Sequence, residues 1–238
     1  MSDKLLVDIY EGDGVEFAVE KVIAAGDPWI GIMVKVSQGT YYAAPKFLDD
    51  MWPRCANAGD RYGKTWFRIP YVYVDFGLDG AAQAEFAFEQ VEDAGGLGKG
   101  DPFFVIDVER GAQRVQLTRD RIVAAGRACS ERLRALTGRK VICYGGELLR
   151  EQHVTINDLD CDAAWVADYE TDLPANVRTG IGLPCFAWQY GGKNGDGSEA
   201  AKLAGYPHTT PAGNADVSAV IINGGGEAGV TYLANCCA

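Results

Sequence analysis

Strand-like and helix-like segments alternate through the first two thirds of this chain, and this alternation constrains its fold more than any other feature. Short apolar runs predict strands, and longer runs with apolar residues at helical spacing predict helices. Strands are expected over residues 5–9, 29–36, 65–76, 102–109 and 139–145. The helices that follow them are expected over residues 15–26, 45–59 (interrupted at Pro53), 81–96, 118–138 (with Thr118 as the cap) and 146–153.

After residue 153 the alternation stops, and three further strands are expected over residues 162–170, 184–192 and 214–222. Strands joined by helices run parallel with right-handed crossovers, and eight strands close naturally into a barrel. We therefore predict an α/β fold, an irregular TIM-like (β/α)5β3 barrel in a single domain. It is expected to span residues 1–225, with 226–238 as a short C-terminal tail containing Gly and Cys.

The composition narrows the classes of partner. Apolar residues make up 47% of the 238 residues, which supplies a sizeable core, and the formal net charge is −11. Such a charge repels phosphate backbones, so we expect no nucleic-acid partner.

No apolar stretch is long enough for a membrane span, and the first residues lack the pattern of a signal peptide. The seven cysteines show no C-x-x-C spacing, which favours buried free thiols over a disulfide framework.

The segment FFVIDVERG, residues 103–111, places two carboxylates at the end of an apolar strand. Side chains two residues apart in a strand share a face about 6–7 Å apart, so Asp107 and Glu109 would both point to the barrel mouth. Neighbouring carboxylates do not both ionise easily, which leaves one protonated acid beside an ionised partner. Cleavage of a glycosidic bond needs that division of labour. A solvated loop pair and a site for a divalent cation are the alternative interpretations.

Polar residues at the other strand ends would share the same rim, because the chemistry of such barrels lies at the carboxyl ends of the strands. Asp8 and Asp216 join Asp107 and Glu109 as catalytic candidates. The candidates for substrate binding are Lys35, Gln38, Tyr73, Asp75, Tyr144, Trp165, Trp188, Gln189 and Tyr190. With only two histidines in the chain, a His-based triad or a His-rich metal site is not expected, and we predict neither metal nor cofactor.

Seven segments, in order from residue 5 to about 222, resemble glycoside hydrolase family 25, the N-acetylmuramidase lysozymes common among phage and bacterial lysins. They are LLVDIYEGDG, GIMVKVSQGTYYAAPKF, FFVIDVERG, VICYGG, AAWVADYE, CFAWQYGG and NADVSAVI. The resemblance implies a (β/α)5β3 barrel that cleaves the β-1,4 bond between N-acetylmuramic acid and N-acetylglucosamine without a metal. It also implies a general acid at Glu109 and a residue that orients the substrate's acetamido group at Asp107.

The resemblance further assigns Asp8 and Asp216 to tuning this pair and binding sugar. Three departures fall on the rim that faces the substrate. Gln38 stands where the family usually has an acid, YVYVDF stands where it has a Tyr-His pair, and YEGDG replaces a W-Q-G turn. The altered rim at Gln38 and Val72 leaves a non-catalytic barrel that binds cell-wall glycan as a rival interpretation, and a chitinase-like barrel hydrolase is a further alternative.

The resemblance also sets expectations for partners and location. Bacterial peptidoglycan is the expected substrate, and the enzyme is expected to be a monomer that does not insert into membranes. Without a recognisable signal peptide, it would be made in the cytoplasm, the host's if it is phage-encoded, and would reach the wall through a holin-type release partner.

Overall fold

The computed structural model describes residues 4–9, 19–45, 50–56, 61–111, 113–169, 180–182, 184–191, 207, 210, 216–222 and 226–237. Several of the expected elements, including the helices predicted over 15–26 and 45–59 and the strand predicted over 214–222, extend partly beyond these residues.

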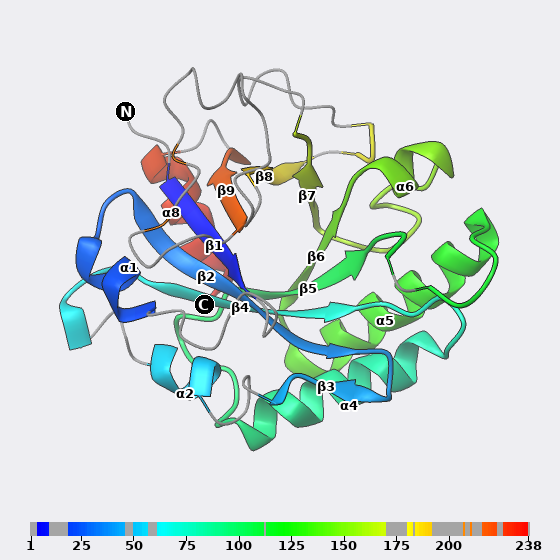
Figure 1. Ribbon diagram of the computed structural model, residues 1–238, viewed down its shortest axis with the longest axis horizontal. Coiled ribbons are helices and arrows are strands. Elements are labelled where there is room, and N and C mark those ends of the chain that lie inside the picture. Colours follow the sequence, from blue (N-terminus) through cyan, green and yellow to red (C-terminus); the bar gives the residue numbers. More distant parts are fainter. Residues whose placement is uncertain are drawn as a thin grey trace.

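Eight strands close into a barrel (Figure 1). They are β1 (Lys4–Ile9), β2 (Trp29–Gln38), β4 (Phe67–Tyr73), β5 (Phe103–Val108), β6 (Lys140–Gly145), β7 (Ala163–Ala167), β8 (Cys185–Gly191) and β9 (Asp216–Val220). The two-residue β3 (Tyr42–Ala43) only pairs back onto the end of β2. Neighbouring barrel strands are parallel except around β9, which is antiparallel to both β1 and β8. The predicted irregular (β/α)5β3 barrel is confirmed.

The described helices lie around the outside of this ring, except for α8 (Gly226–Cys236), which lies across one end of it. The others are α1 (Val19–Ala25), α2 (Trp52–Cys55), α4 (Gly80–Asp93), α5 (Arg119–Thr137) and α6 (Glu147–Glu151). Figure 1 shows α4 and α5 lying together along one flank of the barrel. In α2, Pro53 lies in the first turn, where its missing N–H is not needed, and Met51 before it already has helical backbone angles. None of the described helices combines the length and the apolar character that a membrane span requires.

The ends of α4 and α5 follow ordinary capping chemistry, with one exception. Asp79 caps α4 by accepting a hydrogen bond of 2.8 Å from the backbone N–H of Ala82. Thr118 occupies the N-cap position of α5, as predicted, but its side chain makes no capping hydrogen bond. Gly138 ends α5 in the left-handed conformation, with a φ of 66° that favours glycine.

The apolar residues form two layers, because successive strand side chains point to opposite faces. One layer fills the barrel interior, with Phe103, Trp165 and Phe186 among its members. The other lies between the strands and the helices, and includes Val72, Val108 and Trp188. The ring of Phe186 meets Phe103 and Trp165 edge to face, with centroid distances of 5.0 and 5.5 Å. This filled interior makes the barrel a rigid support for its rim.

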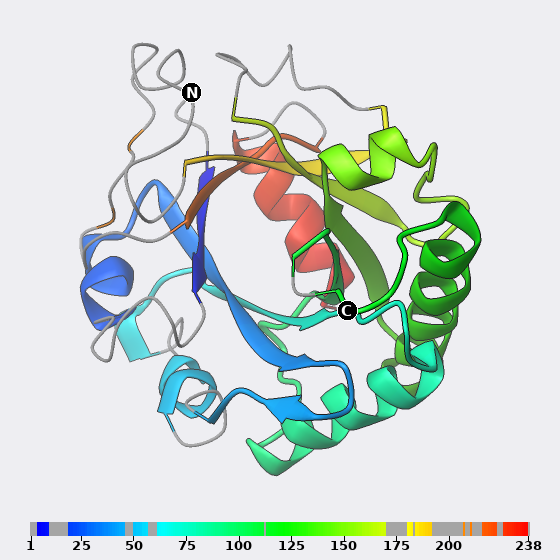
Figure 2. The same ribbon diagram turned by 45° about the vertical axis from the view of Figure 1, so that its right-hand side comes forward.

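Residues 226–236, expected as a tail, form helix α8, which packs against the interior layer at the amino ends of the strands. Leu233 is fully buried, and the Tyr232 ring lies 6.2 Å from that of Phe186 near the start of β8. Lys140, the first residue of β6, places its ammonium 4.6 Å from the centre of the Tyr232 ring. Figure 2 shows α8 in red, behind the ring of strands. The opposite end of the barrel therefore carries the predicted rim.

Candidate active site

The strand register brings the four predicted acids together from both ends of the sequence. Asp107, near the end of β5, lies opposite Tyr73 of β4 and Tyr144 of β6. Asp8 and Asp216 are direct partners across the antiparallel pair of β1 and β9, which closes the ring. Asp216 raises the pKa of Glu109 by charge repulsion, which places the two carboxylates in one electrostatic neighbourhood.

Burial governs the chemistry of the pair on β5. Loss of hydration raises the pKa of Asp107 well above its usual value, and repulsion by Glu109 adds to this. Burial is also the main reason why the pKa of Glu109 is raised. Asp107 is only 7% exposed, whereas Glu109 is half-buried at the strand end. Because the two carboxyls repel each other when both are ionised, the pair retains one proton at a pH at which an isolated carboxyl is ionised.

Lys35 opposes this effect from β2. Its charge lowers the pKa of both Asp107 and Glu109. Its ammonium lies 5.0 Å from the centre of the Tyr73 ring and 5.8 Å from that of Tyr42. A cation held over aromatic faces keeps its position without cancelling its charge. The site therefore holds a cation beside its carboxylates, and the pair of acids can share one proton and one negative charge.

Two tyrosine hydroxyls connect Glu109 to the other side of the rim. A hydrogen bond from Tyr144 lowers the pKa of Glu109, because it stabilises the carboxylate. Tyr144 is also hydrogen-bonded to Tyr169, and burial is the main cause of the raised pKa of both phenols. Asp216 contributes further to the raised pKa of Tyr169. Tyr169 as a whole residue is 41% exposed, although its hydroxyl is largely buried.

On the other flank a polar chain runs from Lys35 away from the acids. The Lys35 ammonium donates to Gln38 Oε1 at 3.4 Å, and Gln38 Nε2 donates to the Tyr41 hydroxyl at 3.1 Å. Tyr41 donates to Asp75 Oδ2 at 3.2 Å, and Asp75 Oδ1 accepts from the N–H of Gly77 at 2.8 Å. The two departures at Gln38 and Asp75 are thus joined through Tyr41 in one network.

The remaining candidates separate into rim and core. Gln189 points inward and donates to Asp216 Oδ2 at 2.8 Å, while its own Oε1 has no hydrogen-bond partner in the described part of the chain. Tyr73 donates to the backbone carbonyl of Glu109 at 3.3 Å. Trp165 is fully buried in the barrel interior below this rim, with its indole N–H on the Ser218 hydroxyl at 2.9 Å.

Trp188 and Tyr190 lie elsewhere. Both are fully buried in the outer layer, where their rings pack 5.0 Å apart. Trp188 donates to the backbone carbonyl of Asp168 at 2.7 Å, and Tyr190 donates to that of Pro207 at 3.0 Å. A side chain with no exposed surface on the outer face of β8 cannot contact a substrate at the mouth. The prediction that these two residues bind substrate is therefore wrong, and their role is to pack the barrel wall.

Two rim residues were not among the sequence candidates. Tyr169 follows β7 by two residues, and a signal was present, because it continues the inward alternation of Trp165 and Ala167. Tyr41 lies in the turn after β2, where no periodicity indicates the direction of a side chain. Among the described residues, no group of three or more His, Cys, Asp or Glu side chains is arranged to hold a metal ion.

Comparison with known proteins identifies the family of this chain. Residues 7–197 match the family described as Glycosyl hydrolases family 25. The chain belongs to glycosyl hydrolase family 25. The matched region includes Asp8, Asp107, Glu109 and Gln189, whereas Asp216 lies after it. The predicted family and enzyme class, a glycoside hydrolase of the N-acetylmuramidase type acting on peptidoglycan, are confirmed by this match.

Solved structures share the fold of this family 25 enzyme at low sequence identity. A bacterial lysozyme from Streptomyces coelicolor is 19% identical, with a TM-score of 0.68 and 99% of each chain covered. A muramidase from Trichobolus zukalii is 18% identical, with a TM-score of 0.68 and coverage of 97% of this chain and 98% of that one. The catalytic domain of endolysin ply40, from bacteriophage P40 of Listeria monocytogenes, is 17% identical, with a TM-score of 0.65 and 98% of each chain covered. No curated protein matches the sequence.

Proposed function

We propose that this family 25 enzyme cleaves the β-1,4 bond after N-acetylmuramic acid with Glu109 as its general acid and Asp107 as its partner. The observation that carries the proposal is the coupled pair at the end of β5, in which burial raises the pKa of both carboxyls. Glu109 is the more exposed of the two and lies at the strand end, so it is the acid within reach of a bound glycan. Asp8 and Asp216 raise the local negative charge, and Asp216 acts on Glu109 directly.

In the proposed reaction, Glu109 gives its proton to the glycosidic oxygen as the bond to the anomeric carbon breaks. The carbonyl oxygen of the substrate's own 2-acetamido group attacks that carbon and forms a cyclic intermediate. Asp107 accepts a hydrogen bond from the acetamido N–H, and its buried Oδ1 has no hydrogen-bond partner among the described residues. Water then opens the intermediate while the Glu109 carboxylate takes up its proton, so the configuration is retained.

The other rim groups have supporting roles in this proposal. Tyr144 holds the Glu109 carboxylate between the two proton transfers, since its hydrogen bond favours the ionised form. Lys35 limits the repulsion between the acids, and Tyr73 fixes the backbone of Glu109. Gln38, Asp75 and Gln189 offer polar atoms to the sugar hydroxyls, and Trp165 supports the rim from below.

Replacement of the proposed acid tests this assignment. Glu109→Gln keeps the shape of the side chain but cannot transfer a proton, so kcat on purified peptidoglycan should fall about 10²- to 10⁴-fold. Glu89→Gln, an exposed change on α4, is the matched control and should leave the rate unchanged. Release of reducing ends gives the rate, and mass spectrometry of the products shows whether muramic acid carries the new end. A Glu109→Gln enzyme as fast as the wild type would exclude the role of Glu109.

The same assay decides between the proposed function and its two rivals. A barrel that only binds glycan, the interpretation drawn from Gln38 and Val72, would sediment with cell walls and release no reducing ends. A chitinase-like enzyme would cleave chitin oligomers and leave peptidoglycan intact. An inverting reaction would give the opposite anomer in the first product, which nuclear magnetic resonance of fresh digests detects.

For partners and location, we propose a monomer that binds no nucleic acid, is made in the cytoplasm and reaches the wall through a holin-type partner. The likeness to an endolysin catalytic domain supports this route, and the net charge of −11 disfavours nucleic acid. Expression in a bacterium should cause lysis only when a holin is co-expressed. Lysis without a holin would contradict the route, and sedimentation of the purified enzyme as a dimer would contradict the monomer.

A further inference from the structure

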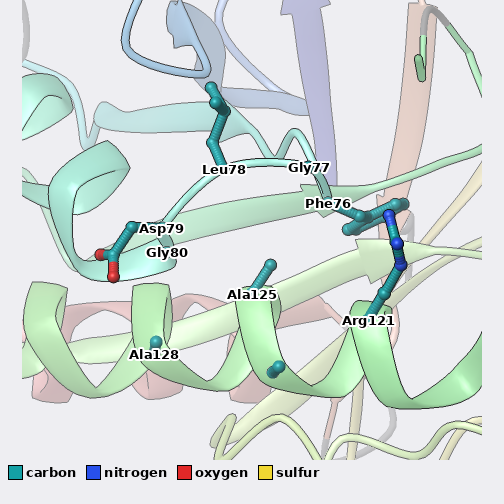
Figure 3. Close-up of a pocket in the computed structure, with 9 residues that line it drawn as sticks. Phe76, Gly77, Leu78, Asp79, Gly80, Arg121, Ala125 and Ala128 are labelled. Atoms are coloured by element: carbon teal, nitrogen blue, oxygen red, sulfur yellow. The ribbon is translucent and has the colours of Figure 1, made fainter. Parts of the chain in front are cut away.

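A pocket of about 400 Å³ lies outside the barrel, between the loop that follows β4 and the helix α5. Phe76, Leu78 and Ala125 give it an apolar lining, and Arg121 and Asp79 add charged groups. Figure 3 shows the Arg121 side chain rising from α5 beside Phe76, while the Asp79 carboxylate lies at the start of α4. That carboxylate caps the helix through the Ala82 N–H, so its charge is already engaged.

The pocket adjoins the rim of the active site through its own lining residues. Leu78 is 36% exposed and packs against the turn after β2. A Cβ added to Gly39 in that turn would lie 3.0 Å from the Leu78 side chain and 2.6 Å from the Tyr41 ring. Tyr41 donates to Asp75, two residues before the pocket residue Gly77. A surface of Tyr41, Gly77 and Leu78 therefore leads from the polar network of the rim to the pocket.

Two arginines give this surface a positive charge in a chain whose net charge is −11. Arg114 lies in the loop that follows β5, with its guanidinium 5.2 Å from the centre of the Tyr41 ring. Arg121 is in the first turn of α5, and both side chains are exposed. Seven other arginines form ion pairs, but in the described part of the chain neither of these two does. Guanidinium groups of this kind bind carboxylates.

We propose that this surface, formed by Tyr41, Leu78, Arg114 and Arg121 around the pocket, binds the peptide stem carried by the muramic acid residue in the active site. The inference rests on the proposed function, because a muramic acid in the groove would present its lactyl-linked peptide to a neighbouring surface. Stem peptides combine alanine methyl groups with free carboxylates. The apolar lining of the pocket suits the methyl groups, and the two arginines suit the carboxylates. The enzyme should therefore bind glycan that retains its peptides more tightly than bare glycan.

Paired substrates test this inference. Peptidoglycan is compared with the same glycan after an amidase has removed its peptides, and kcat and KM are measured from reducing ends. The double variant Arg114→Gln/Arg121→Gln should raise KM for the peptide-bearing substrate about tenfold with kcat unchanged, because it loses binding rather than catalysis. The bare glycan should be cleaved as by the wild type. The matched control is Arg127→Gln/Arg132→Gln, which removes the same charge from exposed, ion-paired positions on α5 and should behave as wild type on both substrates.

The outcomes separate this inference from the proposed function. If KM of the double variant rises equally for both substrates, or for neither, the proposed peptide-binding surface is wrong while the muramidase assignment stands. If the wild type cleaves neither substrate, the proposed function fails. The inference is then decided by calorimetric titration of Glu109→Gln with a disaccharide bearing a tripeptide and with the bare disaccharide. Tighter binding of the peptide-bearing form, lost in the arginine variant, supports the surface, and equal binding overturns it.

Discussion

At the scale of single residues, the site combines catalytic chemistry with a cost in stability at Asp107. Burial raises the pKa of this carboxyl in the folded chain, so the native state holds its proton more tightly than the unfolded state. Stability is therefore fully present below the unfolded pKa of about 4 and declines as the pH rises toward the raised folded value. An asparagine of the same shape cannot ionise and escapes this decline.

We therefore expect Asp107→Asn to be more stable than the wild type at pH 7, by about 1–3 kcal/mol, and less active. The difference in free energy of unfolding should shrink as the pH is lowered to about 4, where both side chains are neutral. Urea unfolding between pH 4 and 8 measures it, with the exposed Asp93→Asn on α4 as the control. A stability difference that does not change with pH would show that burial does not raise the pKa of Asp107 in the folded chain.

The Tyr144 hydroxyl offers a test of how the general acid is tuned. Its hydrogen bond lowers the pKa of Glu109, so Tyr144→Phe should raise that pKa. Because the proposed role of Glu109 as general acid requires its protonated form, the alkaline limb of kcat/KM should move to higher pH in the variant. Tyr232→Phe, on α8 at the far end of the barrel, should leave the pH profile unchanged. An alkaline limb that moves to lower pH would contradict the assigned hydrogen bond.

Strand alternation was enough to predict the direction in which several candidate side chains point. Asp107 and Glu109 lie two apart at the end of an apolar strand, and Gln189 faces inward in the same way. The same alternation that turns Gln189 toward the barrel mouth turns its neighbours Trp188 and Tyr190 toward the helices, so it is a sequence signal against substrate binding by these two residues. Tyr41 could not be placed from sequence, because it sits in a turn and is oriented by hydrogen bonds to residues distant in the chain.

At the scale of elements, the close contact of α4 with α5 depends on one glycine. A Cβ on Gly80 would lie 2.0 Å from the backbone oxygen of Ala125, and a backbone atom cannot move aside as a flexible side chain can. Gly80→Ala should therefore destabilise the fold by about 2–4 kcal/mol. Gly138→Ala is the comparison, because its surroundings are open and only the left-handed φ of 66° is strained, which costs about 1 kcal/mol. Thermal unfolding that ranks the two variants in the opposite order would contradict this account.

Strands and long helices were predictable because their periodicity is local. The hydrogen bonds that the helix ends make were not predictable in this way. Thr118 has the residue type and position of an N-cap, yet its side chain makes no capping bond. The C-terminal segment shows the same limit. Its Gly-rich start gave no helical signal, and α8 is stabilised by Leu233 and Tyr232 packing on strands far away in the sequence.

At the scale of the whole molecule, the barrel separates its chemistry from its stability. One end of the barrel carries the four acids, and antiparallel pairing of β9 with β1 brings Asp216, the first residue of β9, to Asp8 across more than two hundred residues of chain. The amino ends are closed by α8, which completes the interior layer without approaching the rim. Barrel folds in general keep function at the first end and stability at the second.

This separation predicts that damage at α8 affects folding but leaves the reaction unchanged. Leu233 is fully buried, so Leu233→Ala should leave a cavity and lower the free energy of unfolding by about 2–5 kcal/mol. The folded fraction, measured well below its transition temperature, should keep the wild-type kcat and pH profile, because the proposed catalytic residues lie at the other end of the barrel. Glu227→Gln on the same helix, an exposed partner of Lys4, should change stability by less than about 1 kcal/mol. A Leu233→Ala enzyme that is fully folded yet altered in kcat would show that the two ends of the barrel are coupled.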